Sequence, residues 1–339
     1  MFGLFTRAAK NSSVSPSRDQ IGCFGKMPVH ADFIRHGVRE REVVELDSWV
    51  REGVGGLSRK IQAEGLASLA TYPRHHLVMN GGEQDRTLVA TLCAGRDRGG
   101  RAYPFLVFRL ADEPLFRHMQ AAVPLAFDGF FQQSSALLAA PWNQEPLGLL
   151  LERVDALASR DTSLDRRQVL DRQIRLLGDY SQGRFWAGTF PGIIPRRQEM
   201  FEALFSALRS VARRGTQRTS WGLRLPLPAG KPLLPTVMFW VQLVEALLEE
   251  PHWRAHYFWQ GGDAGFPACL TLFFRPLAPS QFLCLLPSRC DEAGLFDLRL
   301  AMHQRSDVRC PEELARMLRD DEVSMLDLLY RAGRREVLS

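Results

Sequence analysis

The chain of 339 residues is long enough for two domains of ordinary size. Hydrophobic residues make up 45% of it and charged residues 24%, a balance that is typical of globular proteins and excludes extensive disorder. Its 43 basic and 38 acidic residues leave a formal net charge of only +5, so the composition gives little support for nucleic-acid binding.

The cysteines and the apolar segments bear on where the protein works. None of the six cysteines has a Cys-x-x-Cys partner, so we expect buried free thiols in a reducing compartment. The start of the chain lacks the order of a secretory signal, because its basic residues follow a short apolar stretch. The most apolar segment, 233–248, is short for a membrane span and contains Gln242 and Glu245. These features favour a bacterial cytoplasmic protein without membrane insertion.

The chain is predicted to begin with an arm, a strand and a helix. Residues 1–20 show no apolar period and are rich in Ser, Pro and charge, as expected for a flexible arm. Residues 21–26 are typical of a short strand. Over 43–50, Val43 and Leu46 begin an apolar face with helical spacing.

A hairpin is predicted next. Residues 77–79, 87–94 and 103–110 are predicted strands, because they are rich in β-branched and apolar residues. The glycine-containing turn at 97–101 joins the last two strands. Helical periods follow over 114–150.

The second half again mixes strands and helices. The aromatic run at 185–190 is predicted as a short strand. A helix is expected at 195–215, because Pro195 suits the first turn of a helix and Gly215 its C-cap. The further predicted elements are strands at 221–225, 257–259 and 268–275, a helix at 235–248 and a helical tail over 311–339.

Together these patterns predict an α/β (α+β) fold, with mixed or antiparallel sheets and helices packed on their faces in two sandwich-like domains. No internal repeat typical of a solenoid or propeller is visible. The predicted organisation is a flexible arm at 1–20, an N-terminal domain at 21–150, a charged helical connector at 151–178, a second α/β domain at 179–300 and a helical tail at 301–339.

The sequence contains no motif for nucleotide, metal or nucleophilic chemistry. Lys26 and Lys231 follow glycines but lack the Ser or Thr that a phosphate-binding loop requires. His252 and His256 are four residues apart, which would suit a metal on a helix, but no glutamate lies between them and strand-like residues follow. No Gly-x-Ser-x-Gly elbow is present. We therefore expect no enzymatic activity, no cofactor and no bound metal.

The charged turn at 97–101 has two interpretations. Asp97, Arg98 and Arg101 can form a solvated hairpin loop that its glycines close. Alternatively, the turn recognises a partner, because arginine guanidinium groups suit carboxylates and phosphates.

Two strings in the first half carry a family resemblance. The first is GCFGKMP at 22–28, which runs on to DFIR at 32–35, and the second is DRGGRAYPF at 97–105. They resemble the signatures of the TagF (ImpM) family: a Gly-aromatic-aromatic-Gly-Lys-x-Pro strand followed by Gly-Asp-Phe, and an Asp-Arg-x-Gly-Arg turn leading to aromatic-Pro. Cys23 and Ala31 depart from this pattern. The resemblance covers most of the first half and is weaker in the second.

This resemblance implies a cytoplasmic accessory protein of the type VI secretion machine, which in some systems represses secretion after translation. Members of the family act through a forkhead-associated scaffold protein, against a threonine kinase pathway that activates assembly. Two other classes stay open. One is a structural or assembly component of the machine, and the other is an enzyme of phosphoprotein signalling, which would need a cluster of metal-binding aspartates.

The candidate partner-binding residues come from the two signatures. The same segments also have a structural interpretation, in which Gly25 and Pro28 shape the strand exit and Asp32 caps a following helix. Gly99 and Gly100 would close the turn. The candidates for partner binding are Lys26, Asp32, Arg35, Asp97, Arg98 and Arg101.

Overall fold

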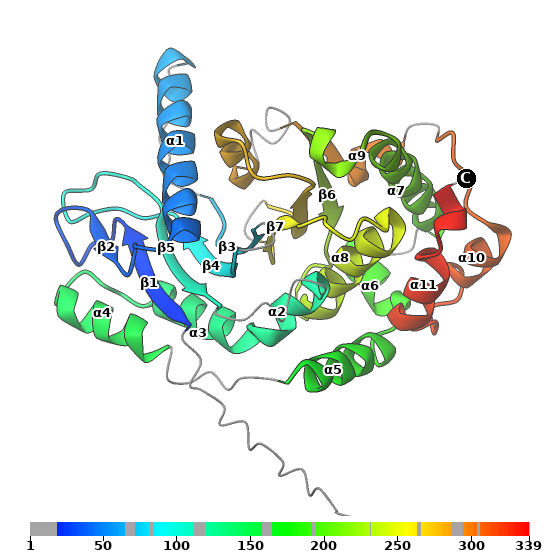
Figure 1. Ribbon diagram of the computed structural model, residues 1–339, viewed down its shortest axis with the longest axis horizontal. Helices are drawn as coiled ribbons and strands as arrows, with labels where there is room; N and C mark the ends of the chain where they lie inside the picture. Colours follow the sequence, from blue (N-terminus) through cyan, green and yellow to red (C-terminus); the bar gives the residue numbers. More distant parts are fainter. Residues whose placement is uncertain are drawn as a thin grey trace, which may run out of the picture.

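The described part of the protein folds around one nine-stranded sheet that both halves of the chain build (Figure 1). Neighbouring strands are antiparallel except β6 and β9, which are parallel, so the sheet is mixed. This confirms the predicted α/β fold. In order across the sheet, the strands are β2 (Ile34–His36), β1 (Gln20–Gly25), β5 (Phe105–Leu110), β4 (Thr87–Cys93), β3 (His75–Asn80), β7 (His256–Gln260), β8 (Cys269–Phe273), β6 (Gly222–Pro226) and β9 (Leu295–Asp297).

A computed structural model describes most of the chain. The described residues are 19–64, 72–81, 85–111, 119–157, 165–190, 194–230, 232–262, 266–286, 294–303 and 306–338. Their helices are α1 (Arg41–Glu64), η2 (Gln120–Ala122), α2 (Val123–Ala126), α3 (Asp128–Ala139), α4 (Leu147–Ala156), α5 (Arg166–Gly178), α6 (Gln182–Thr189), α7 (Ile194–Arg214), η4 (Thr216–Arg218), α8 (Leu234–Leu248), η5 (Pro279–Leu285), α9 (Leu298–Ala301), α10 (Glu312–Met317), α11 (Met325–Ala332) and η7 (Arg335–Leu338).

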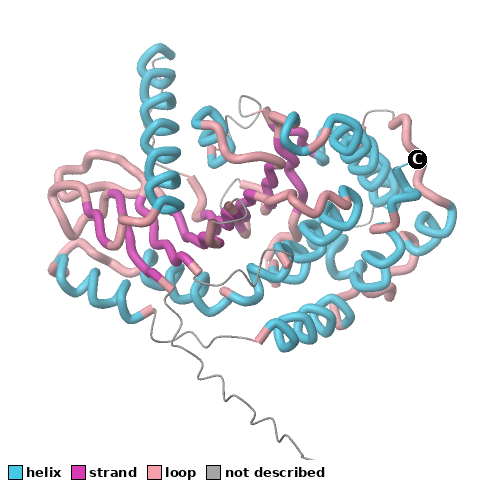
Figure 2. Tube along the Cα trace, in the orientation of Figure 1, coloured by secondary structure: helices cyan, strands magenta, loops and turns pink. Residues whose placement is uncertain are grey.

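The two faces of the sheet bury different helices. Successive residues of a strand point to opposite faces, so in β3 Val78 belongs to one apolar core and Leu77 to the other. The first core packs α2 to α11 against the sheet. The second contains α1 and η5, which lie above the sheet in the view of Figure 2.

Helix α1 confirms the predicted helix at 43–50 and connects the two halves over the second face. Its Trp49 ring stacks on Phe258 of β7, with the ring centroids 5.6 Å apart, and also packs against Phe282 of η5. The indole Nε1 donates to the carbonyl of Ala278 at 3.0 Å. Gly53 lets η5 approach, because a Cβ at this position would lie 2.3 Å from Phe282. Residues of α1 are therefore fixed by the second half of the chain.

Strands β3 and β7 join the halves edge to edge. Leu77 pairs with Phe258 and Val78 with Tyr257 in antiparallel register. The division into domains at 21–150 and 179–300 stays a prediction, but the sheet and both apolar cores continue across it. The contact between the halves is thus made in the middle of the sheet and does not depend on the predicted connector alone.

Buried hydrogen bonds reinforce this junction. The Gln120 side chain accepts from the backbone N of Ala255 at 2.6 Å and donates to the carbonyl of Trp253 at 3.0 Å. Asn80 of β3 donates to the carbonyl of Ala255 at 2.9 Å, and Tyr257 donates to the carbonyl of Gln120 at 2.8 Å. Since unsatisfied polar groups are costly inside a protein, this network favours one arrangement of the halves.

The predicted strand at 185–190 is wrong, because residues 185–189 belong to α6 and Phe190 is its C-cap. Trp186 Nε1 donates to the side chain of Gln182, four residues earlier, at 3.1 Å, which is the spacing of neighbours on one face of a helix. Phe185 and Trp186 are both buried in the first core. A short aromatic run fits a buried strand and a buried helix equally well, and packing decides between them.

The other predicted elements are confirmed with shifted ends or lie outside the described residues. The helices expected at 195–215 and 235–248 are α7 and α8, and the predicted strands of both halves are β1 and β3 to β8. The predicted connector contains most of α4 and all of α5. Residues 158–164 of the connector and residues 1–18 of the predicted arm lie outside the described residues. The tail contains α10 and α11. No helix of the described residues is long and apolar enough to cross a membrane.

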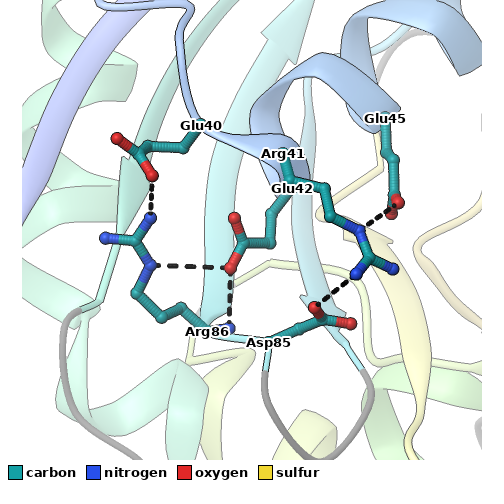
Figure 3. Close-up of polar contacts among 6 residues, drawn as sticks. All are labelled: Glu40, Arg41, Glu42, Glu45, Asp85 and Arg86. Atoms are coloured by element: carbon teal, nitrogen blue, oxygen red, sulfur yellow. Dashed lines mark hydrogen bonds and ion pairs between the residues drawn. The ribbon is translucent and has the colours of Figure 1, made fainter.

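Charged side chains tie the start of α1 to the start of β4 (Figure 3). Arg86 donates from its backbone N to Glu42 at 2.9 Å and from its guanidinium to Glu40 at 2.6 Å. Burial alone raises the pKa of Glu42, but the hydrogen bonds and charge of Arg86 bring it below its ordinary value. The contact therefore stabilises the ionised form of Glu42 and fixes the helix on the sheet.

Replacing Arg86 should weaken this attachment. Arg86→Ala removes the guanidinium that contacts Glu40 and Glu42, while the backbone N–H of residue 86 still donates to Glu42, so we expect the free energy of unfolding to fall by about 1 kcal/mol in urea denaturation. Arg41→Ala is the matched control, because Arg41 bonds Glu45 and Asp85 but its side chain is 71% exposed, against 26% for Arg86. Equal losses in the two variants would contradict this account.

Replacing Gln120 tests the junction between the halves. Gln120→Leu keeps the side-chain size but leaves the buried N–H of Ala255 without its acceptor, and it removes one of two side-chain donors to the carbonyl of Trp253, which Arg254 also contacts. We expect a loss of about 2–4 kcal/mol in the free energy of unfolding, measured by circular dichroism in urea. Gln132→Leu, on the exposed side of α3, should change it little. If Gln120→Leu were as stable as wild type, the network would not be what holds the halves together.

Candidate functional site

The two signature segments meet at one end of the first half of the sheet. Residues 26–33 follow β1 and are here called the β1 loop, and residues 94–104 connect β4 to β5 and are called the β4–β5 turn. Phe105, at the start of β5, pairs with Gly25 on one side and Cys93 on the other. The loop and the turn consequently leave the sheet side by side.

Two glycines permit this close approach. Gly25 has a φ of 122°, and a Cβ there would lie 2.0 Å from the carbonyl oxygen of Pro104. At Gly95 a Cβ would lie 2.3 Å from the carbonyl oxygen of Lys26. Any side chain at either position would push the two segments apart, so Gly25 has the structural role that the sequence suggested.

Asp97 is a buried carboxylate at the centre of the contact. Its side chain is inaccessible to solvent. One oxygen lies 3.0 Å from Lys26 Nζ and 2.7 Å from Arg101 Nε, and the other accepts from the backbone N of Arg101 at 2.9 Å. A buried charge needs such compensation, which the β1 loop and the turn supply together.

The surroundings of Asp97 decide its chemistry. Burial on its own raises the pKa of this carboxyl, but the hydrogen bonds from Lys26 and Arg101, together with the charge of Lys26, lower it to about 2. A carboxyl group that loses its proton so far below neutrality is a poor general acid or base at physiological pH. Asp97 is therefore suited to holding the loops and not to general acid–base catalysis.

Two arginines of the turn donate hydrogen bonds to backbone carbonyls of the β1 loop. Arg98 donates from its guanidinium to Val29 at 2.7 Å and from its backbone N to His30 at 2.9 Å. Arg101 donates to the carbonyl of Ala31 at 2.7 Å. We call the set of side chains that join loop and turn the clasp, and it consists of Lys26, Asp97, Arg98 and Arg101.

Asp32 and Arg35 lie beside the clasp but outside it. Asp32 is exposed and accepts from the backbone N of Phe33 at 2.8 Å. The prediction that Asp32 caps a helix is wrong, because β2 follows it and α1 begins only at residue 41. Arg35, on β2, donates to Asp47 of α1 at 2.9 Å. Four of the six candidates thus meet, and two serve neighbouring contacts.

The outer surface of the clasp is basic. Arg96, Arg98 and Arg101 are exposed, and the Arg101 side chain keeps 63% of its surface accessible while it bonds Asp97. Phe33 and Tyr103 pack edge to face beside them, with ring centroids 4.6 Å apart. Exposed guanidinium groups next to aromatic rings form a surface suited to carboxylate or phosphate groups of a partner.

A small pocket opens next to the clasp. Met27 and Pro28 of the β1 loop and Arg96 of the turn line one side, and Leu138 and Trp142 line the other. Its volume is about 280 Å³. Sequence analysis missed this pocket. Met27, Pro28 and Arg96 stand inside or next to the signatures, which was a usable signal, but nothing in the sequence showed that Trp142 would face them.

The described residues offer no obvious metal site. They contain no group of three or more His, Cys, Asp or Glu side chains that could hold an ion. His256 begins β7, so it does not share a helix with His252. It is also buried, and burial lowers its pKa to about 4. The five described cysteines are free, in agreement with the expectation of free thiols.

Comparisons with known proteins found a matching family model and a similar solved structure. The family model of the TagF N-terminal domain, type VI secretion system-associated, matches residues 22–157. Among solved structures, PA0076 of Pseudomonas aeruginosa PAO1 is similar with a TM-score of 0.42 and 16% sequence identity, over 79% of this chain and 94% of that chain. No curated protein sequence matches. The match at 22–157 contains the clasp and the pocket.

The clasp predicts a specific pH dependence of stability. The folded-state pKa of Asp97, about 2, is below its ordinary value of 3.8. Its contribution is therefore full above pH 3.8 and is lost as the pH falls toward 2. We expect Asp97→Asn to lower the melting temperature at pH 7 by about 3–6 °C. The difference from wild type should shrink between pH 4 and 2, and a constant difference would contradict this role.

Proposed function

We propose that this chain, whose residues 22–157 match the TagF N-terminal domain, type VI secretion system-associated, is a non-enzymatic regulator of that system. In this proposal it represses secretion after translation, in the cytoplasm, by binding the forkhead-associated scaffold protein. The observation that carries the proposal is the clasp, whose one buried carboxylate is used for folding while three arginines of the turn face solvent.

The clasp supports binding better than catalysis. A catalytic acid or base needs a pKa near the working pH, and the Asp97 pKa of about 2 is far from it. The exposed faces of Arg98 and Arg101 are held by hydrogen bonds to the β1 loop, so little conformational freedom is lost when a partner binds them. A fixed basic surface of this kind suits an acidic or phosphorylated surface of the scaffold.

Repression would then follow from occupancy. A protein that binds one state of the scaffold lowers the amount of that state available for assembly of the machine. No chemical step is required, and the effect is reversed when the complex dissociates. The strength of repression should depend on the ratio of this protein to the scaffold.

The direct test is capture of the purified scaffold by the immobilised protein. We expect wild type to retain the scaffold at micromolar concentration and Arg98→Ala/Arg101→Ala to retain it about tenfold less tightly. Arg213→Ala/Arg214→Ala, two exposed arginines at the end of α7, is the charge-matched control and should bind like wild type. Thermal unfolding confirms that each variant is folded.

The outcomes separate the functional classes. Unchanged capture by folded Arg98→Ala/Arg101→Ala would place the contact elsewhere on the chain. No capture by wild type would overturn the regulator proposal. If the purified protein then assembles with other secretion components into large particles, the structural-component class becomes the better account.

A further inference from the structure

We infer that the pocket beside the clasp receives one apolar side chain from an acidic segment of a partner protein. The inference deepens the proposed function and rests on it, since it concerns how a bound partner would be recognised. The pocket has a volume of about 280 Å³ and is formed by parts of the chain that are distant in sequence.

Both signature segments contribute to its wall. Met27 and Pro28 belong to the first signature, and Arg96 immediately precedes the second. The clasp fixes these two segments against each other, so it also fixes this side of the pocket. The opposite side comes from the end of α3 and the loop that follows it, with Leu138 and Trp142. The signatures thus build a concave site as well as a turn.

The interior suits an apolar group. Apolar residues make up most of its lining, and Met27, Leu138 and Trp142 are the largest of them. Cys93 also lines the pocket, and burial raises the pKa of its thiol to about 11, so it stays neutral at physiological pH. Pockets for small-molecule ligands usually have volumes of about 300–1,000 Å³. A site at the lower limit of that range fits a single anchoring side chain, as at the centres of many protein interfaces.

The rim carries positive charge. Arg96 is the one charged residue among the described residues that line the pocket. Arg153, which is exposed, lies over the Trp142 ring with its guanidinium carbon 5.2 Å from the ring centroid. Arg98 and Arg101 are on the adjoining turn, while the charge of Asp97 is buried and compensated.

This charge distribution selects the occupant. A segment with carboxylates next to its apolar residue would meet Arg96 in the wall of the pocket and the exposed Arg98 and Arg101 of the adjoining turn. A second copy of this chain would bring the same arginines to the contact and would be repelled. The walls are also held before binding, because Arg96 donates to the carbonyl of Gly100 at 3.2 Å and Trp142 Nε1 donates to Leu137 at 2.8 Å. Such preorganisation favours affinity.

The test uses defined peptides and a pocket-filling variant. The probe is a fluorescein-labelled heptapeptide with one central phenylalanine between three acidic residues on each side, and its binding is followed by fluorescence anisotropy. We expect Ala140→Phe, which fills the pocket, to weaken binding at least about tenfold. Ala139→Phe is the matched control, because Ala139 is exposed and does not line the pocket, and it should bind like wild type.

Two further comparisons test the recognised chemistry. A peptide with serine in place of phenylalanine, and one with lysines in place of the acids, should each bind at least about tenfold more weakly. Arg96→Glu should weaken binding of the acidic peptide, and Arg59→Glu, on the exposed side of α1, should not. The inference is overturned if wild type shows no saturable binding of the phenylalanine peptide up to about 2 mM, or if folded Ala140→Phe binds it equally well.

The same variants separate this inference from the proposed function. If wild type and folded Ala140→Phe capture the scaffold equally, the pocket is not the anchor site and the regulator proposal stands. If wild type captures no scaffold but binds the acidic peptide in the pocket, the regulator proposal fails and the pocket remains a docking site for another acidic partner.

Discussion

The antiparallel pairing of β3 with β7 is the constraint on which the rest of the structure depends. Without it, each half of the chain would expose the edge of a buried apolar strand, an arrangement that promotes aggregation. The contacts of Trp49 with η5 and of Gln120 with the β7 side reinforce the same junction on the two faces of the sheet. The match to the TagF N-terminal domain ends at residue 157, yet the sheet of that domain is completed by the second half.

A second constraint acts at the free end of the first half. Burying the Asp97 carboxylate requires donors from two loops at once, and Lys26 and Arg101 provide them. The same geometry sets the outer faces of Arg98 and Arg101 and one wall of the pocket. In the proposed function, folding and recognition share these residues, so a binding assay of any clasp variant has to be interpreted together with the stability of that variant.

The fold was predictable where local pattern determines it. The helices α7 and α8 and the strand β4 have long apolar periods that few alternatives satisfy, and they were found in the sequence. The helix α6 was not predicted, because its short aromatic run fits the period of a strand and the period of a helix equally well. Its Gln182 side chain donates to the carbonyl of Asp320, a contact across 138 residues that no local pattern contains. The β3–β7 pairing and the parallel β6–β9 pair were beyond prediction for the same reason.

The candidate site shows the same division. The signatures identified the four clasp residues, but the composition of a turn cannot show that Asp97 would be buried while Arg98 and Arg101 stay exposed. The signature residues that identify the resemblance are consequently the ones that hold the β1 loop and the β4–β5 turn together. In the proposed function, the surface that distinguishes partners lies next to them, at Arg96, which lines the pocket and is not a member of the clasp, so its side chain can change while the clasp contacts are kept.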